Sequence, residues 1–218
     1  LIGALVCLSL IPVSLTRVRA PVIDHFVTLP LGELFRASPT GFAGSLGAGV
    51  TVGALYAIGP LFGQQLGLST AGITLFMGAT IAGAALVQLP LGRLSDRYDR
   101  RILLVATLLL ATLVCVGLTR DLFQYGTAAV MLAGVALGGF LTSIYPLSLA
   151  QTLDHVEARS FVGASSGLLI CYSIGAVAGP LTASVMMDIM GASGFPLMVA
   201  ATGILLAAFT LHRMIVRD

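Results

Sequence analysis

Charged side chains are scarce in this chain, and they gather in one short segment. Between residues 92 and 101, six of ten side chains are charged, namely Arg93, Asp96, Arg97, Asp99, Arg100 and Arg101. Carboxylates and guanidinium groups at this spacing can form ion pairs, and the arginines can also contact lipid phosphates. The pattern predicts a tight connection between two helices, with Gly92 at the exit of the first helix and Asp96 or Asp99 capping the second.

Other chemically capable residues are scattered. Three cysteines lie inside apolar runs, which indicates buried thiols and no disulfide framework. Three histidines lie far apart in the sequence, so neither a metal-ligand cluster nor a cofactor is expected. No apolar run carries Asp, Glu or His near its middle, whereas intramembrane catalysis would need paired carboxylates, a metal set or a Ser/His pair. We therefore do not expect an enzyme.

The elements that hold these residues must lie in lipid. Hydrophobic residues make up 57% of the 218 residues and charged residues 9%, against about 25% charged in a typical soluble domain. Six full apolar runs are of helix-spanning length or nearly so, and none alternates as barrel strands do. They cover residues 42–62, 71–91, 102–119, 127–150, 161–187 and 195–211. The net charge of +2 is too small to indicate nucleic acid as a partner.

The arginines divide unevenly between alternate connections. All 11 basic residues are Arg. With six spans, ten of them fall on one side of the membrane and Arg120 alone falls on the other. The positive-inside rule makes the arginine-rich side, with the C-terminus, cytoplasmic.

Glycine patterns indicate two related halves within the six runs. The pattern Gly49-Val50-x-x-Gly53 recurs as Gly134-Val135-x-x-Gly138. Three crossings invert the chain, so a repeat would give two three-helix units of opposite topology, as in many secondary transporters. Coincidence is the alternative, since such glycine pairs are frequent in membrane helices. The third and sixth runs are poor in glycine and are expected to be outer, lipid-facing helices.

The start of the chain has two interpretations. Residues 1–16 are apolar but lack the basic residues that begin a signal peptide. We interpret them as the end of a membrane helix, so the chain is expected to be a fragment. The expected organisation is a helix end at 1–16, a cytoplasmic loop at 17–41 and a six-helix domain at 42–218.

The charged loop resembles the signature loop of the major facilitator superfamily, Gly-x-Leu-(small)-Asp-Arg-x-Gly-Arg-(basic). The matching residues are Gly92, Leu94, Asp96, Arg97, Arg100 and Arg101, while Asp99 stands where the family usually has Gly. The resemblance implies a secondary active transporter in a plasma membrane, such as a bacterial inner membrane. It would move a small solute, in or out, by rocker-switch alternating access.

Members of that superfamily have twelve helices in two halves. The span count and the position of the loop after the second full span match the second half. The expected fold is therefore all-α, a polytopic six-helix bundle of two inverted three-helix repeats. Its partners would be the lipid bilayer and an N-terminal six-helix half. A membrane-embedded scaffold or channel subunit is the alternative, and an intramembrane enzyme is a weaker one.

The same resemblance implies roles for particular residues. Asp96, with Arg100, would contact the other half when the cytoplasmic gate is shut. The candidates for the solute cavity are Thr51, Tyr56, Gln88, Ser143, Tyr145 and Tyr172, with Ser148, Ser166 and Ser173 as further polar positions. For each of these a structural role is the alternative, because Ser and Thr often bond their own helix and Tyr often marks the membrane interface. Protons are a candidate coupling ion, with the protonatable group in the other half.

Overall fold

The computed structural model describes residues 7–8, 11, 29–119 and 127–216. Most of the expected helix end at 1–16, residues 17–28 of the expected loop and Arg120 lie outside these residues. The described elements are α2 (Leu31–Ala37), α3 (Pro39–Gln65), α4 (Thr70–Ser95), α5 (Arg100–Leu118), α6 (Thr127–Leu153), α7 (Phe161–Met190) and α8 (Gly194–Val216), with 3₁₀ turns at Ala158–Ser160 and Gly191–Ser193. The fold is all-α in the described part of the chain.

Each of the six apolar runs forms a long helix, α3 to α8. Five stretches of the described residues are long and apolar enough to cross a membrane, and the last, Ala158–Val216, is 59 residues long and contains both α7 and α8. Local signals place the helix starts. The Ser38 side chain accepts a hydrogen bond from the Gly41 N–H at 3.3 Å, and Pro39 follows it at the first helical position, where proline costs the helix little.

Two details differ from the sequence-based expectation. The segment expected to be a loop contains the short helix α2, and α3 begins at Pro39. The reason is visible in the packing of α2, because Leu34 is fully buried against Ala164 and Leu168 of α7. One apolar side chain on a seven-residue helix is too weak a signal to be recognised by periodicity alone.

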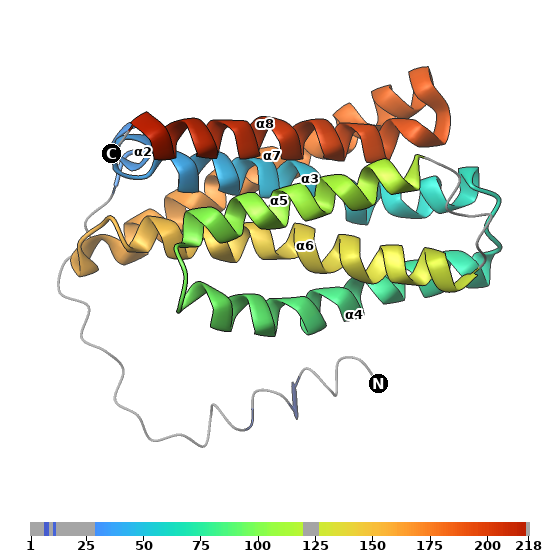
Figure 1. Ribbon diagram of the computed structural model, residues 1–218, viewed down its shortest axis with the longest axis horizontal. Coiled ribbons are helices and arrows are strands. Elements are labelled where there is room, and N and C mark those ends of the chain that lie inside the picture. Colours follow the sequence, from blue (N-terminus) through green and yellow to red (C-terminus); the bar gives the residue numbers. More distant parts are fainter. Residues whose placement is uncertain (1–6, 9–10, 12–28, 120–126, 217–218) are drawn as a thin grey trace.

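The helices run back and forth along one common direction, as Figure 1 shows. One end of the bundle holds α2, the α4–α5 connection, the α6–α7 connection and the last turn of α8; we call it the α2 end. Every arginine among the described residues lies at this end, namely Arg36, Arg93, Arg97, Arg100, Arg101, Arg159 and Arg213. The separation of arginines that the span count predicted is therefore present in the described structure.

Helix pairing follows the inverted repeat. The most extensive contacts are α3 with α7, α4 with α6, and α5 with α8. If the unit α3–α4–α5 is exchanged with α6–α7–α8, the first two pairs interchange and the third maps onto itself. This is the relation expected of two three-helix repeats of opposite topology.

Glycines make the first two pairs close. A Cβ added at Gly53 would meet the backbone of Ala176 on α7, and a Cβ added at Gly138 would meet the backbone of Thr80 on α4. Gly53 and Gly138 are the corresponding glycines of the two sequence motifs. The repeat in the sequence is thus a repeat in packing, in which small residues let helix backbones approach in an apolar medium.

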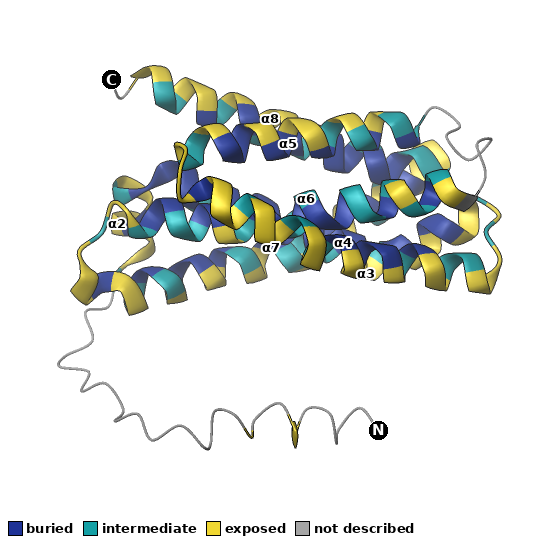
Figure 2. Cartoon of the chain, turned by 60° about the horizontal axis from the view of Figure 1, so that its bottom comes forward, coloured by how far each residue is buried: buried dark blue, intermediate teal, exposed yellow. Residues whose placement is uncertain are grey.

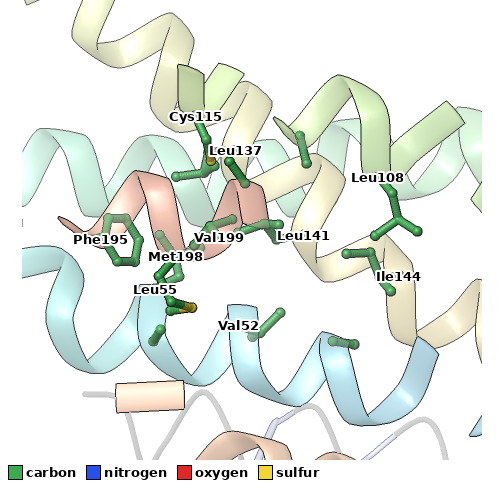
Figure 3. Close-up of a cluster of buried hydrophobic side chains, with 14 of the residues drawn as sticks. Val52, Leu55, Leu108, Cys115, Leu137, Leu141, Ile144, Phe195, Met198 and Val199 are labelled. Atoms are coloured by element: carbon green, nitrogen blue, oxygen red, sulfur yellow. The ribbon is translucent and has the colours of Figure 1, made fainter. Parts of the chain in front are cut away.

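The core lies between helices of both repeats. Figure 3 shows side chains from four helices meeting there: Val52 and Leu55 of α3, Leu108 and Cys115 of α5, Leu137, Leu141 and Ile144 of α6, and Phe195, Met198 and Val199 of α8. These side chains are buried within the bundle.

The most exposed long helix is α4. Only 22% of its most apolar window is buried, against 44–56% for the other four stretches, and Figure 2 shows exposed residues along much of its length. Glycine content predicted that α5 and α8 would be outermost. The exposure of α4 was not anticipated: of its glycines only Gly83 packs against α6, and much of the remaining α4 surface is uncovered in the described structure.

Candidate functional site

The charged loop joins α4 to α5 at the α2 end. The two helices end and begin at Ser95 and Arg100, so the connection is four residues long. Asp99 is the N-cap of α5, and its side chain accepts a hydrogen bond from the Arg101 N–H at 2.8 Å. Of the two aspartates that the sequence left open for this role, Asp99 is the cap.

The first two arginines of α5 hold the loop to the end of α6. The Arg100 Nε lies 3.2 Å from Asp154 Oδ2. The Arg101 Nη2 lies 3.1 Å from His155 Nε2, and His155 Nδ1 lies 2.8 Å from the Gln151 carbonyl oxygen. The motif loop is therefore bonded to a connection more than fifty residues further along the chain.

Asp96 is exposed and has no partner among the described residues. It is the C-cap of α4, and its side chain makes no hydrogen bond or ion pair with any residue that the structure describes. Arg100, which was expected to act with Asp96, pairs with Asp154 instead. The backbone explains this, because the first turn of α5 directs Arg100 toward α6 while Asp96 closes α4.

Gly92 lies inside the last turn of α4. It does not supply the tight exit that the sequence predicted, because the positive-φ glycines of the described chain are Gly67 and Gly191. A Cβ added at Gly92 would meet nothing within 4 Å. The helix surface one turn before Asp96 is therefore open to close approach from outside this bundle.

Two of the predicted cavity residues lie with the loop. A cavity of about 340 Å³ between the ends of α4 and α6 is lined by Gln88, Ser143, Asp96 and Arg100 among others. The Gln88 Nε2 donates to the Thr142 carbonyl at 3.3 Å, which links α4 to α6. Gln88 and Ser143 thus belong to the surroundings of the motif loop.

Three tyrosines from three helices form a separate group. The rings of Tyr145 on α6 and Tyr172 on α7 meet edge to face, with centroids 5.1 Å apart. Tyr56 lies on α3, the helix that is paired most extensively with α7, and is 42% exposed. Among the described residues of α3, α6 and α7, these are the only tyrosines, and no charged residue lies in the middle of those helices.

Four hydroxyl candidates bond their own helices, whereas Ser166 is exposed on α7 and its side chain makes no hydrogen bond with the described residues. The Thr51 hydroxyl is buried and donates to the Gly47 carbonyl at 3.0 Å. Ser143 and Ser148 donate in the same way to Gly139 and Ile144. The exposed Ser173 donates to Leu169 at 2.8 Å. Hydrogen bonding to their own helix therefore accounts for the hydroxyls of Thr51, Ser148 and Ser173. Ser143 also lines the cavity beside the loop.

Comparison with known proteins assigns the family. The family model described as "Major Facilitator Superfamily" matches residues 1–217.

The chain belongs to the major facilitator superfamily.

Its relatives in that superfamily are bacterial. It is 26% identical over 189 residues to an uncharacterized MFS-type transporter of Enterobacter sp. (strain 638), covering 86% of this chain and 48% of the relative. It is 27% identical over 182 residues to the uncharacterized MFS-type transporter YcaD of Escherichia coli, covering 83% of this chain and 46% of the relative. The chain spans about half the length of the curated relatives it matches.

Membership of the superfamily makes this an integral membrane protein of a transporter family. The resemblance predicted from Gly92, Asp96 and the following arginines is therefore confirmed at the level of the family, and so is the half-fold of six helices. Sequence reasoning missed Asp154 and His155 as partners of the loop. The available signal was that they are the first ionisable residues after the apolar run of α6, at the same end of the bundle as the motif.

Proposed function

We propose that this chain is one half of a secondary active transporter that moves a small solute by rocker-switch alternating access. In this proposal a second six-helix half faces α4 and α7, and the solute passes between the halves. The Gly-x-Leu-Ser-Asp-Arg loop lies on the cytoplasmic side and acts as a gate. The protein lies in a bacterial inner membrane, with the α2 end and the C-terminus in the cytoplasm.

The unpartnered state of Asp96 carries this proposal. Three neighbouring residues of the loop, Asp99, Arg100 and Arg101, are all bonded within the bundle. Asp96 is exposed, and the helix face beside it at Gly92 is open. A carboxylate beside an open helix face suits the N-terminus of another helix, where the backbone N–H groups and the dipole favour a negative charge. The loop thus has one anchored side and one side free to bind another half.

The tyrosine group supports an uncharged or weakly polar solute path. Tyr56, Tyr145 and Tyr172 offer ring faces and hydroxyl groups, and the described middle portions of α3, α6 and α7 carry no charge. A rigid aromatic pair beside polar hydroxyls suits a small solute with an apolar body and a hydrogen-bonding group. We propose that any coupling proton is carried by a group outside the described residues.

Paired aspartate variants test the gate. In the full reading frame that encodes this chain, Asp96→Asn removes the free carboxylate, and Asp99→Asn removes an equal charge three residues away. Asparagine is as good an N-cap as aspartate, so Asp99→Asn should keep α5 intact. The solute would first be found by accumulation assays on a solute panel in cells that express the protein.

We expect Asp96→Asn to slow solute flux in proteoliposomes by about tenfold, the effect of losing one charge-assisted contact of ~1.5 kcal/mol. Solute affinity at equilibrium should be unchanged, and Asp99→Asn should transport at the rate of the unmodified protein. Equal flux in all three proteins would contradict the gating role of Asp96.

A further inference from the structure

The contact between Arg101 and His155 exists in one protonation state only. His155 Nδ1 lies 2.8 Å from the Gln151 carbonyl oxygen, which can only accept a hydrogen bond. Nδ1 must therefore carry a hydrogen. His155 Nε2 lies 3.1 Å from the Arg101 Nη2, which can only donate, so Nε2 must offer its lone pair. This geometry requires the neutral, Nδ1-protonated imidazole.

We propose that His155 is a pH-sensitive latch on the motif loop. When His155 is neutral, Arg101 donates to it and the first turn of α5 is held against the end of α6. When His155 is protonated, Nε2 carries a hydrogen and two cations face each other at hydrogen-bond distance. The contact then breaks, and the Arg100–Asp154 ion pair is the remaining side-chain link from the start of α5 to the end of α6 among the described residues. Protonation of a histidine is favoured as the pH falls, so the latch opens as the pH on that side of the membrane falls.

The charges around His155 do not replace this contact. A polar cavity there is lined by residues of the loop, α5 and α6: Ser95, Asp96, Tyr98, Asp99, Arg100, Arg101, Gln151, Asp154 and His155. Asp99 is occupied in capping α5, and Asp154 is paired with Arg100. On the other side, Glu157 is paired with Arg159 at 2.6 Å. Asp96 is the carboxylate of this cavity that has no partner among the described residues.

The latch gives the loop a regulatory input, and only its effect on transport depends on the proposed function. Because the hydrogen bond between His155 and Arg101 lies at the surface, we expect only a modest change in the population of the displaced loop. We expect the population of the displaced loop to rise about two- to tenfold between pH 8 and pH 5, the range given by net hydrogen-bond energies.

The test measures the position of the loop directly. In the full reading frame, with the three native cysteines of this segment replaced, spin labels are placed at Tyr98→Cys and Ala158→Cys, both on exposed positions. Pulsed electron paramagnetic resonance in lipid nanodiscs then gives the distance between the labels from pH 8 to pH 5. We expect one narrow distance at pH 8 and a growing second, longer distance as the pH falls.

Two histidine variants decide the assignment. In His155→Gln the side-chain oxygen can still accept from Arg101 but does not titrate, so the distance should stay constant with pH. In His212→Gln, which removes another exposed histidine near the end of α8, the response should be unchanged. A constant distance in the unmodified protein, or an equal response in His155→Gln, would overturn the proposal.

A failed gate gives a different result from a failed latch. If the distance responds to pH and His155→Gln abolishes the response, the latch stands whatever the transport assay shows. If Asp96→Asn leaves transport unchanged in the same protein, the gating role fails while the latch remains. Circular dichroism of each variant checks that the helices are intact.

Discussion

Hydroxyl groups in the spanning helices fall into two kinds. The Thr51 hydroxyl is buried and donates to its own helix at Gly47. Tyr172 is half-buried and packs edge to face on Tyr145 of α6. A hydroxyl that bonds its own backbone has no donor left for a solute, whereas a tyrosine hydroxyl at the end of a rigid ring does.

This difference gives a prediction at the residue scale. Tyr172→Phe keeps the ring pair and removes one hydroxyl, so the KM for the transported solute should rise about two- to tenfold, the effect of one lost hydrogen bond. Thr51→Val removes a self-bonded hydroxyl of similar size and should leave KM unchanged. Concentration-dependent uptake into vesicles measures both, and an increase in KM for Thr51→Val alone would contradict this assignment.

Local residue roles were predictable where the partner is local. The sequence indicated that an aspartate would cap α5, and the cap is Asp99. It did not reveal the partner of Arg100, because Asp154 lies on another helix and the pairing depends on how α5 and α6 cross. It also named Gln88 and Ser143 as candidates for the solute cavity, and the structure adds that both line the cavity beside the loop. Sequence position gives depth along a helix, but which neighbour a side chain meets is set by tertiary packing.

At the scale of the element, glycine positions decide which helix faces are closed. On α4, a Cβ at Gly83 would meet the Val135 carbonyl of α6, whereas a Cβ at Gly78 would meet nothing within 4 Å. The two glycines are five residues apart on one helix and differ mainly in this contact. They form a matched pair for measuring the α4–α6 interface.

We expect Gly83→Ala to lower the free energy of unfolding by about 1–3 kcal/mol, because the helices must separate to admit the methyl group. Gly78→Ala should leave the unfolding free energy unchanged or raise it by up to ~1 kcal/mol, since alanine favours the helix. Unfolding in mixed detergent micelles, followed by circular dichroism, gives both values; the absence of Trp rules out indole fluorescence. Equal stabilities would show that the α4–α6 crossing is looser than described.

Helix identity was predictable because lipid leaves few choices. A run of apolar residues in a bilayer must form its backbone hydrogen bonds internally, so each run becomes a helix whatever its neighbours. The exposure of α4 was not predictable from its glycines, because composition does not say how many neighbours share a helix. The short helix α2 was missed because its single buried anchor, Leu34, is recognised only by its contacts with α7.

At the scale of the whole molecule, all described arginines lie at the α2 end. Such an asymmetry fixes the direction of insertion, so the two ends should label from opposite sides. We expect Ala158→Cys to react with a membrane-impermeant maleimide only from the cytoplasmic side. Gln65→Cys, at the far end of α3, should react only from the opposite side.

The labelling is read by mass shift in right-side-out and inverted vesicles, in a background without native cysteines. Labelling of both sites from one side would contradict the span arrangement, and exchange of the two sides would reverse the orientation. The topology could be predicted from the sequence, because arginine-rich and arginine-poor connections alternate from one span to the next. The helix pairing was indicated only where a glycine motif recurs.

The pairing of helices across the repeats bears on the order in which the protein is made. In the described structure, α3 and α4 find their most extensive contacts with α7 and α6, which the ribosome completes later, and contacts of α3 with α4 and of α4 with α5 are few. During synthesis, α3, α4 and α5 enter the bilayer before these later neighbours are made. Each of these helices is long and apolar enough to cross a membrane, and insertion of single helices is the first of two stages in membrane-protein assembly. The arrangement postpones tertiary assembly until α6 and α7 are inserted, so a mutation that polarises α3 or α4 would act during biogenesis, before any packing defect in the finished bundle.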